Sequence, residues 1–170
     1  MWVAVGKGTN SIAYSYNGSD WQTGPNSNNI FSDSGQGVAW NGTMWVAVGK
    51  GTNTIAYSYN GINWQTVPNS NNIFTHGYGV AWNGTMWVAV GEGSSYHTIY
   101  YSYNGINWFG LSTTIFSDSG RGVAWNSGIP DISMNTIILD KLDIVNDKFF
   151  NKGFQDLTLT ITAKKYYFNN

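Results

Sequence analysis

The 170-residue sequence has no cysteine and little charge. Without cysteine the chain can form neither a disulfide nor a thiolate metal site. Charged residues make up 10% of the chain, well below the roughly 25% of ordinary globular proteins. Asn, Ser, Thr, Gly and Tyr must therefore cover much of the surface. The formal net charge of −1 argues against nucleic-acid binding driven by bulk charge.

Three further features of the sequence limit the classes of protein that it can encode. No apolar run reaches the ~18–20 residues of a membrane span. No basic segment followed by an apolar one opens the sequence, so we expect no signal peptide. Arginine and glutamate occur once each, as Arg121 and Glu92, which limits any chemistry that needs several of either.

What the sequence does have is a repeat. The hexapeptide MWVAVG begins at Met1, Met44 and Met86, spacings of 43 and 42 residues. Periods of this size are typical of propeller blades and of helical solenoids. The many glycines and the short β-branched and aromatic runs favour strands over helices. Because Met1 occupies an interior position of the unit, either the chain begins in mid-unit or it belongs to a longer array.

Each unit predicts four antiparallel strands. In the best-defined copy an Asn-Gly pair separates the first two strands and another separates the last two. Asn-Gly is the preferred pair of the type I′ hairpin turn. The four predicted strands are Gly79–Trp82, Trp87–Gly91, Thr98–Tyr103 and Asn107–Phe109. A four-stranded antiparallel meander repeated about every 42 residues predicts an all-β array of propeller-type blades.

The segment between the third and fourth strands carries a family resemblance. Residues 58–64 read SYNGINW, and residues 15–21 and 102–108 give the other two copies. This pattern resembles the Asp-box, or BNR, repeat of form Ser-x-Asp-x-Gly-x-Thr-Trp. Here Asn stands for Asp and the box is one residue shorter, but the Asn oxygen can still accept turn N–H bonds. The resemblance covers residues 1–126.

The resemblance implies several further expectations. In that family the box closes the hairpin between the third and fourth strands of a blade, and its Trp packs between blades. Similar arrays occur in uncharacterised proteins of large DNA viruses and in environmental sequences. A virion or extracellular location is thus implied by resemblance alone, and the sequence leaves localisation open.

About three repeats do not make a closed ring, since propellers have ~4–8 blades. Residues 122–125 predict the first strand of a further blade. We therefore expect self-association or a longer parent chain. Residues 127–170 differ in composition, and 157–162 alternate between apolar and polar residues as a half-buried strand does. They predict a small divergent β-rich element that caps the array or begins another domain.

No catalytic or metal site is predicted. A sialidase-like glycoside hydrolase is the less favoured alternative, because that family's chemistry uses three arginines and this chain has one. His76 and His97 have no cysteine or histidine partner at ligand spacing, so no metal and no cofactor are expected. Most of the nine tryptophans recur at fixed positions of the repeat and are interpreted as packing residues.

The loops at one end of the units favour binding. Turns at the Asn-Gly end are nearly identical between units, whereas the opposite loops vary and hold six of the seven charges of residues 1–126. Loops on a rigid scaffold commonly carry function. We therefore predict a non-catalytic binding module for a glycan or a protein. A purely structural repeat segment is the alternative. The candidate contact residues are Tyr96, His97, His76 and Tyr78, with Asp33 and Asp118 to accept hydroxyl bonds.

Overall fold

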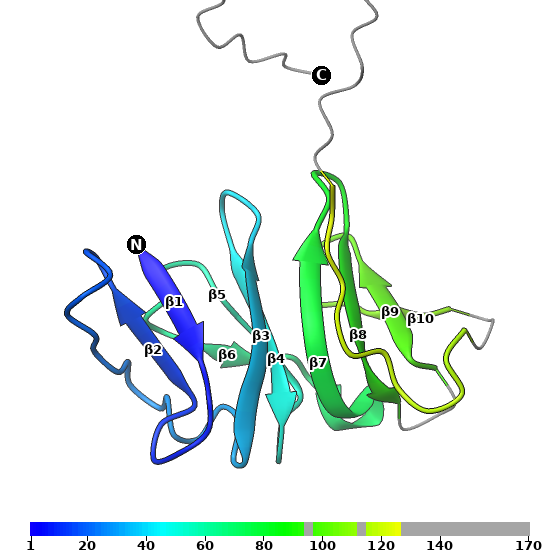
Figure 1. Ribbon diagram of the computed structural model, residues 1–170, viewed down its shortest axis with the longest axis horizontal. Coiled ribbons are helices and arrows are strands. Elements are labelled where there is room, and N and C mark those ends of the chain that lie inside the picture. The colour runs from blue at the N-terminus through cyan, green and yellow to red at the C-terminus, as the bar shows by residue number, and fades with distance from the viewer. Residues whose placement is uncertain (94–96, 112–114, 127–170) are drawn as a thin grey trace, which may run out of the picture. The chain divides into compact units, whose positions relative to one another are not determined.

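A computed structural model describes residues 1–93, 97–111 and 115–126, all within the compact unit Met1–Gly128 (Figure 1). Apart from a 3-10 turn, η1 (Ser70–Asn72), the regular elements of these residues are all β-strands, so the predicted all-β fold is confirmed. Within the same residues, no helix has the length and apolar character that crossing a membrane requires. The β-rich element predicted for residues 127–170 lies outside the described residues.

The strands form three successive meanders, which we call blades 1, 2 and 3 (Figure 1). Within each blade, strands that are neighbours along the chain pair antiparallel, as the repeat predicts. Blades 2 and 3 have four strands each, and in blade 1 an isolated Tyr14–Gln22 bridge takes the place of the last pairing. The array has the partial, propeller-type form that was predicted. Blade 1 contains β1 (Trp2–Val5) and β2 (Ile12–Ser15); blade 2 contains β3 (Ser34–Trp40), β4 (Trp45–Lys50), β5 (Ile55–Ser58) and β6 (Gln65–Thr66); blade 3 contains β7 (Phe74–Trp82), β8 (Trp87–Gly93), β9 (Ile99–Ser102) and β10 (Phe109–Gly110).

The predicted type I′ turns are wrong. Type I′ needs positive φ at both central residues, yet only the glycine of each Asn-Gly pair has it, for example Gly42 at 102°. The Asn41 side chain explains why, because its Oδ1 accepts the N–H groups of Thr43 (2.9 Å) and Met44 (2.7 Å). The two-residue loop is therefore Gly42-Thr43, with glycine at its first position as in type II′ turns.

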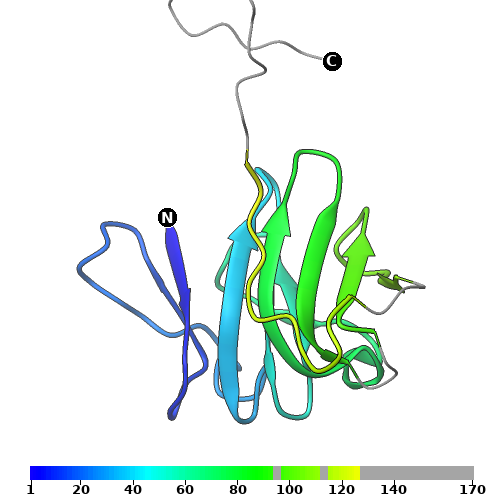
Figure 2. The same cartoon turned by 45° about the vertical axis from the view of Figure 1, so that its right-hand side comes forward.

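The inner strands β3 and β7 are longer than predicted and lie next to each other. A Cβ added to Gly37 would be 3.1 Å from the Cα of Gly79, and one added to Gly79 would be 3.3 Å from the Cα of Gly122. Glycine is thus needed here for close approach of backbones, although it weakens a strand elsewhere. Residues 122–125 run beside β7 but belong to no sheet of the described part, so the strand predicted for them is not formed there (Figures 1 and 2).

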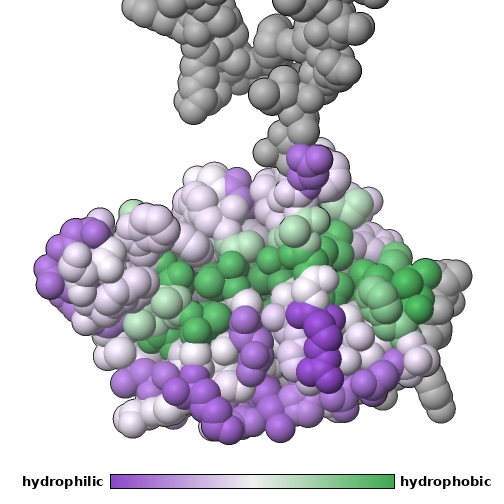
Figure 3. Space-filling model, viewed as in Figure 1, coloured by the Kyte–Doolittle hydropathy of each residue, from purple (hydrophilic) through white to green (hydrophobic). Residues whose placement is uncertain are grey.

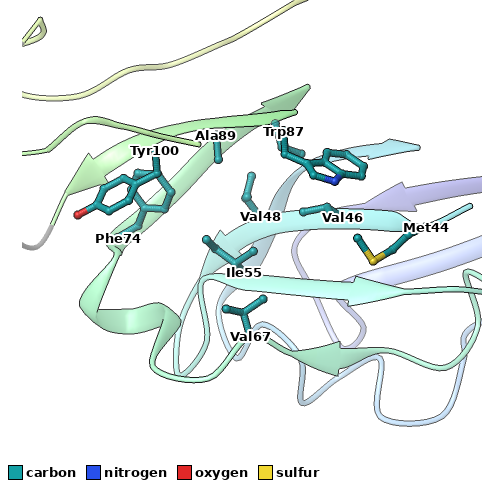
Figure 4. Close-up of a cluster of buried hydrophobic side chains, with 10 residues drawn as sticks. Met44, Val46, Val48, Ile55, Val67, Phe74, Trp87, Ala89 and Tyr100 are labelled. Atoms are coloured by element: carbon teal, nitrogen blue, oxygen red, sulfur yellow. The ribbon is translucent and has the colours of Figure 1, made fainter. Parts of the chain in front are cut away.

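Two hydrophobic clusters lie between the blades, one in each gap. Strand β4 shows how a single strand serves both, since successive side chains of a strand point to opposite faces. Val46 and Val48 are buried toward blade 3, whereas Ala47 is buried toward blade 1. Figure 4 shows the larger cluster, where Trp87 of blade 3 lies beside Val46, and Phe74 packs against Tyr100 in the same cluster. Blades are therefore held together mainly by apolar faces of alternating strand residues.

Candidate functional site

Polar side chains gather along the edge of the unit that carries the variable loops (Figure 3). Backbone pairing continues across the blades at this edge. Lys7 bridges Ser34, Ser34 pairs with Lys50, Lys50 pairs with His76, and His76 pairs with Glu92. The ladder places charged side chains of three blades in one line, which we call the charged row. Its members are Lys7, Asp33, Lys50, His76, Glu92 and Arg121.

The first half of the charged row is an ion-pair network centred on Asp33. Lys7 Nζ lies 3.0 Å from Asp33 Oδ1, and Lys50 Nζ lies 3.3 Å from Asp33 Oδ2. Hydrogen bonds from Lys7 and then Lys50 lower the pKa of the Asp33 carboxyl below its ordinary value. The lysine side chains are exposed, so the network is accessible from solvent.

The second half also centres on a carboxylate, that of Glu92. Glu92 occupies the place that Lys50 has in blade 2, and His76 Nδ1 lies 2.9 Å from Glu92 Oε2. The hydrogen bond with His76 is the main cause that lowers the pKa of Glu92, and the charges of His76 and Arg121 add to it. The guanidinium carbon of Arg121 lies 4.5 Å from the centre of the Tyr78 ring, a cation–π contact.

The structure brings only part of the predicted site together. His76 and Tyr78 lie side by side, with ring centroids 6.0 Å apart and planes inclined by 25°. Asp33 belongs to the same row, but Asp118 lies in an exposed stretch, where its Oδ2 accepts a hydrogen bond from Ser119 Oγ at 3.5 Å. His97 packs edge-on against Tyr100, with ring centroids 5.9 Å apart. Tyr96 lies outside the described residues.

Sequence reasoning left Lys7, Lys50, Glu92 and Arg121 out of the candidate site. The signal that could have included them was the concentration of charge at the loop end. The pairing of Lys50 with His76 across two blades had no signature in either segment alone. This inter-blade register is what aligns the four charges with Asp33 and His76.

A row of exposed tyrosines at the Asn-Gly end was also missed. Tyr16, Tyr59 and Tyr103 occupy equivalent positions and are between 62% and 70% exposed. Each contacts a second tyrosine edge-on, with ring centroids 5.9–6.0 Å apart. The sequence signal that could have identified them is the tyrosine that precedes Asn-Gly in every unit. The alternation of side chains along the strand directs this tyrosine to solvent. We call these three residues the tyrosine row.

The described residues contain no group of three or more His, Cys, Asp or Glu side chains placed to hold a metal ion. Comparison with protein-family models and with curated proteins finds no match. The geometry of the charged row and the tyrosine row therefore provides the basis for assigning a function.

Proposed function

We propose that this protein is a non-catalytic interaction module that binds a protein partner through the charged row. The supporting observation is the backbone ladder that connects Lys7, Lys50, His76 and Glu92 across three blades. Asp33 and Arg121 lie beside it and interact with its charged side chains. Complementary charges on a partner would steer association and fix its register. The backbone pairing beneath these side chains keeps their spacing fixed.

The contacts of the aromatic residues favour a protein over a glycan at this edge. A sugar stacks on an open aromatic face. Arg121 lies over the ring of Tyr78, and His97 packs against Tyr100. These contacts reduce the aromatic surface that the sequence assigned to sugar binding and leave a mainly ionic row.

The proposed membership in an Asp-box-like family rests on the hairpin between β5 and β6. Asn60 Oδ1 accepts the N–H groups of Ile62 (3.0 Å) and Asn63 (2.8 Å), and Ser58 Oγ accepts that of Gly61 (2.8 Å). Asn thus makes the turn contacts that an Asp oxygen could make. A virion or cell-surface location follows from this resemblance and belongs to the same proposal.

Affinity capture with charge-reversed chains tests the protein-binding function. The immobilised chain should retain a partner from extracts or virion-associated material at 50 mM salt and release most of it at 500 mM. Lys50→Glu should lose that partner, because it repels Asp33 and reverses the middle of the row. Asp20→Lys is the matched control, since Asp20 is the one array charge outside the loop end.

Retention of the same partner by Lys50→Glu would exclude the charged row as its binding site. Failure of the wild-type chain to retain any partner would favour the structural repeat segment. Asp20→Lys should keep the wild-type thermal midpoint, because exposed substitutions usually change stability by no more than ~0.5 kcal/mol. Lys50→Glu loses the exposed ion pair with Asp33 and should lower the midpoint only slightly.

The tyrosine row favours a second candidate function, glycan binding. Three exposed aromatic rings at one per blade can stack on successive sugars of a chain. In a glycan screen Tyr59→Ala should weaken binding, whereas His76→Ala should leave it unchanged. The opposite pattern would place a glycan on the charged row instead.

A further inference from the structure

Two strand edges of the unit lack the neighbour that their repeats have. Within the described residues β1 pairs only with β2, and residues 122–125 belong to no sheet. In blade 2 the corresponding segments pair with each other, Gly37 with Val48 and Ala39 with Val46. Blade 3 repeats this register. β1 and residues 122–125 therefore each correspond to one strand of a pair that is complete in blades 2 and 3.

Two exposed tryptophans mark the same missing pair. Trp40 and Trp45 lie across β3 and β4 with ring centroids 4.9 Å apart, and Trp82 and Trp87 repeat the contact at 5.1 Å. The equivalents are Trp125 on the free segment and Trp2 on β1. Trp125 is 56% exposed, against 41% for Trp40 in its pair, and Trp2 is 62% exposed, whereas its equivalent Trp87 is fully buried.

We propose that two copies of this chain associate head to tail by strand complementation. Residues 122–125 of one copy pair antiparallel with β1 of a second copy, in the register seen in blades 2 and 3. Trp125 then lies beside Trp2 of the second copy, and Ala124 beside its Val3. Addition of a strand to an open sheet edge is a common mode of recognition.

The faces behind these strands complement each other in the same way. Within the chain, Met1 and Val3 of blade 1 contact the turn glycine Gly61 of blade 2, and Met44 and Val46 contact Gly105 of blade 3. Gly18, the equivalent glycine of blade 1, has only Trp2 of its own blade near its Cβ position. In the complex, Met86 and Val88 of blade 3 take this place against Gly18 of the second copy.

A second copy fits better than an unrelated protein because the junction continues the interfaces between blades. Neither residues 122–125 nor residues 2–5 contain a charge, so the seam buries no unpaired ion. The interface is heterologous, and such an interface closes a ring when its rotation permits. With three blades from each copy, two copies give about six blades, within the ~4–8 of known propellers.

Two variants each disable one half of the junction. The Asn41 N–H donates to Met44 O at 3.1 Å, and hydrogen-bonded pairs alternate along antiparallel strands, so Ala39 and Val46 form such a pair. Ala124 corresponds to Ala39, and Ala124→Pro removes its donor. Ala124→Ser retains the donor as control. Trp2→Lys places a charge in the seam, and Asn28→Lys is its control because Asn28 is exposed and lies outside both β1 and residues 122–125.

Sedimentation of the 170-residue chain should show association of wild type and of both controls. Ala124→Pro and Trp2→Lys alone should each be monomeric at concentrations where wild type is fully associated, at least a tenfold weakening. An equimolar mixture of the two should form a 1:1 complex and grow no further, because Trp2→Lys keeps an intact 122–125 segment and Ala124→Pro keeps an intact β1. Misfolded variants cannot give this rescue.

Three results would overturn the proposal. These are a monomeric wild type at concentrations up to hundreds of micromolar, association of either single variant with wild-type affinity, and a mixture that stays monomeric. Loss of association in only one of the two variants would point to contact between like faces and would also exclude the head-to-tail junction.

Discussion

Replacement of Trp87 by alanine should be among the most destabilising single changes in the chain. Trp87 is fully buried in the cluster between blades 2 and 3 (Figure 4). A tryptophan buries ~150–250 Å², which at ~25 cal/mol per Å² amounts to roughly 4–6 kcal/mol. Measured Trp→Ala changes in cores cost about 3–5 kcal/mol. We therefore expect a loss of about 3–5 kcal/mol in the free energy of unfolding.

Trp2 provides the internal comparison, because it holds the same place in blade 1. It is 62% exposed, so less than half of its surface is buried. Trp2→Ala should cost less than about 2 kcal/mol by the same conversion. The measurement must use a protein concentration at which the chain is monomeric, since the proposed junction would bury this residue.

Trp87→Phe separates packing from hydrogen bonding. Among the described residues the indole Nε1 of Trp87 is buried without a hydrogen-bond partner. Phenylalanine removes that unpaired donor, whose burial costs about 1–3 kcal/mol, and so recovers part of the cost of the smaller ring. We expect Trp87→Phe to be more stable than Trp87→Ala by at least ~1 kcal/mol.

Urea unfolding followed by circular dichroism and fluorescence measures all three variants. The midpoint should fall furthest for Trp87→Ala, with an unchanged slope if the blades unfold together. The reasoning about inter-blade burial fails if Trp87→Ala lies within 1 kcal/mol of wild type. It fails equally if Trp2→Ala costs as much as Trp87→Ala in the monomer.

Three further predictions follow from the loops and turns. Asp33 and Glu92 have lowered pKa values, so their stabilisation is present above the unfolded-state pKa values near 4 and is lost as pH falls through the folded ones. The thermal midpoint should therefore drop between pH 5 and 2, and less steeply in the Asp33→Asn/Glu92→Gln variant; parallel curves would contradict this. Gly79→Ala should cost about 1–3 kcal/mol in urea unfolding, since its Cβ would lie 3.2 Å from Val123 N, whereas Gly6→Ala, with no atom within 4 Å, should be nearly neutral. Asn60→Asp should keep the turn and change the midpoint little. Asn60→Ala should cost about 1–2 kcal/mol, because two backbone N–H groups lose their acceptor; equal costs would show that Oδ1 is not what holds the turn.

The repeat and the Asn-Gly pairs between its strands were sufficient to predict most of the strands and the blades. They were insufficient for the turn type, because Asn41 Oδ1 binds two backbone N–H groups and leaves glycine alone at positive φ. They also underestimated β7, because the predicted strand began at Gly79, whereas β7 begins at Phe74 and includes Gly77. Those glycines are required by the close approach of neighbouring inner strands, a contact between units that no single unit reveals.

The candidate site was harder to predict for a related reason. The sequence showed that charge concentrates at the loop end, but membership of the charged row depends on register between blades. The single Lys50–His76 pairing sets that register. For the aromatic candidates, the sequence did not show that Arg121 lies over the ring of Tyr78 or that His97 packs against Tyr100.

The change from Lys50 to Glu92 at equivalent places of the charged row has an electrostatic reason. In blade 2 Lys50 has Asp33 as its partner. In blade 3 His76 pairs with residue 92 in the sheet, and the charge of Arg121 also interacts with the Glu92 carboxylate. A lysine at 92, copied from blade 2, would meet a cation and a histidine and find no carboxylate among those neighbours. Glu92 instead accepts a hydrogen bond from His76 and offers a negative charge to Arg121. A carboxylate at position 92 therefore suits the arginine that the following segment adds to the row.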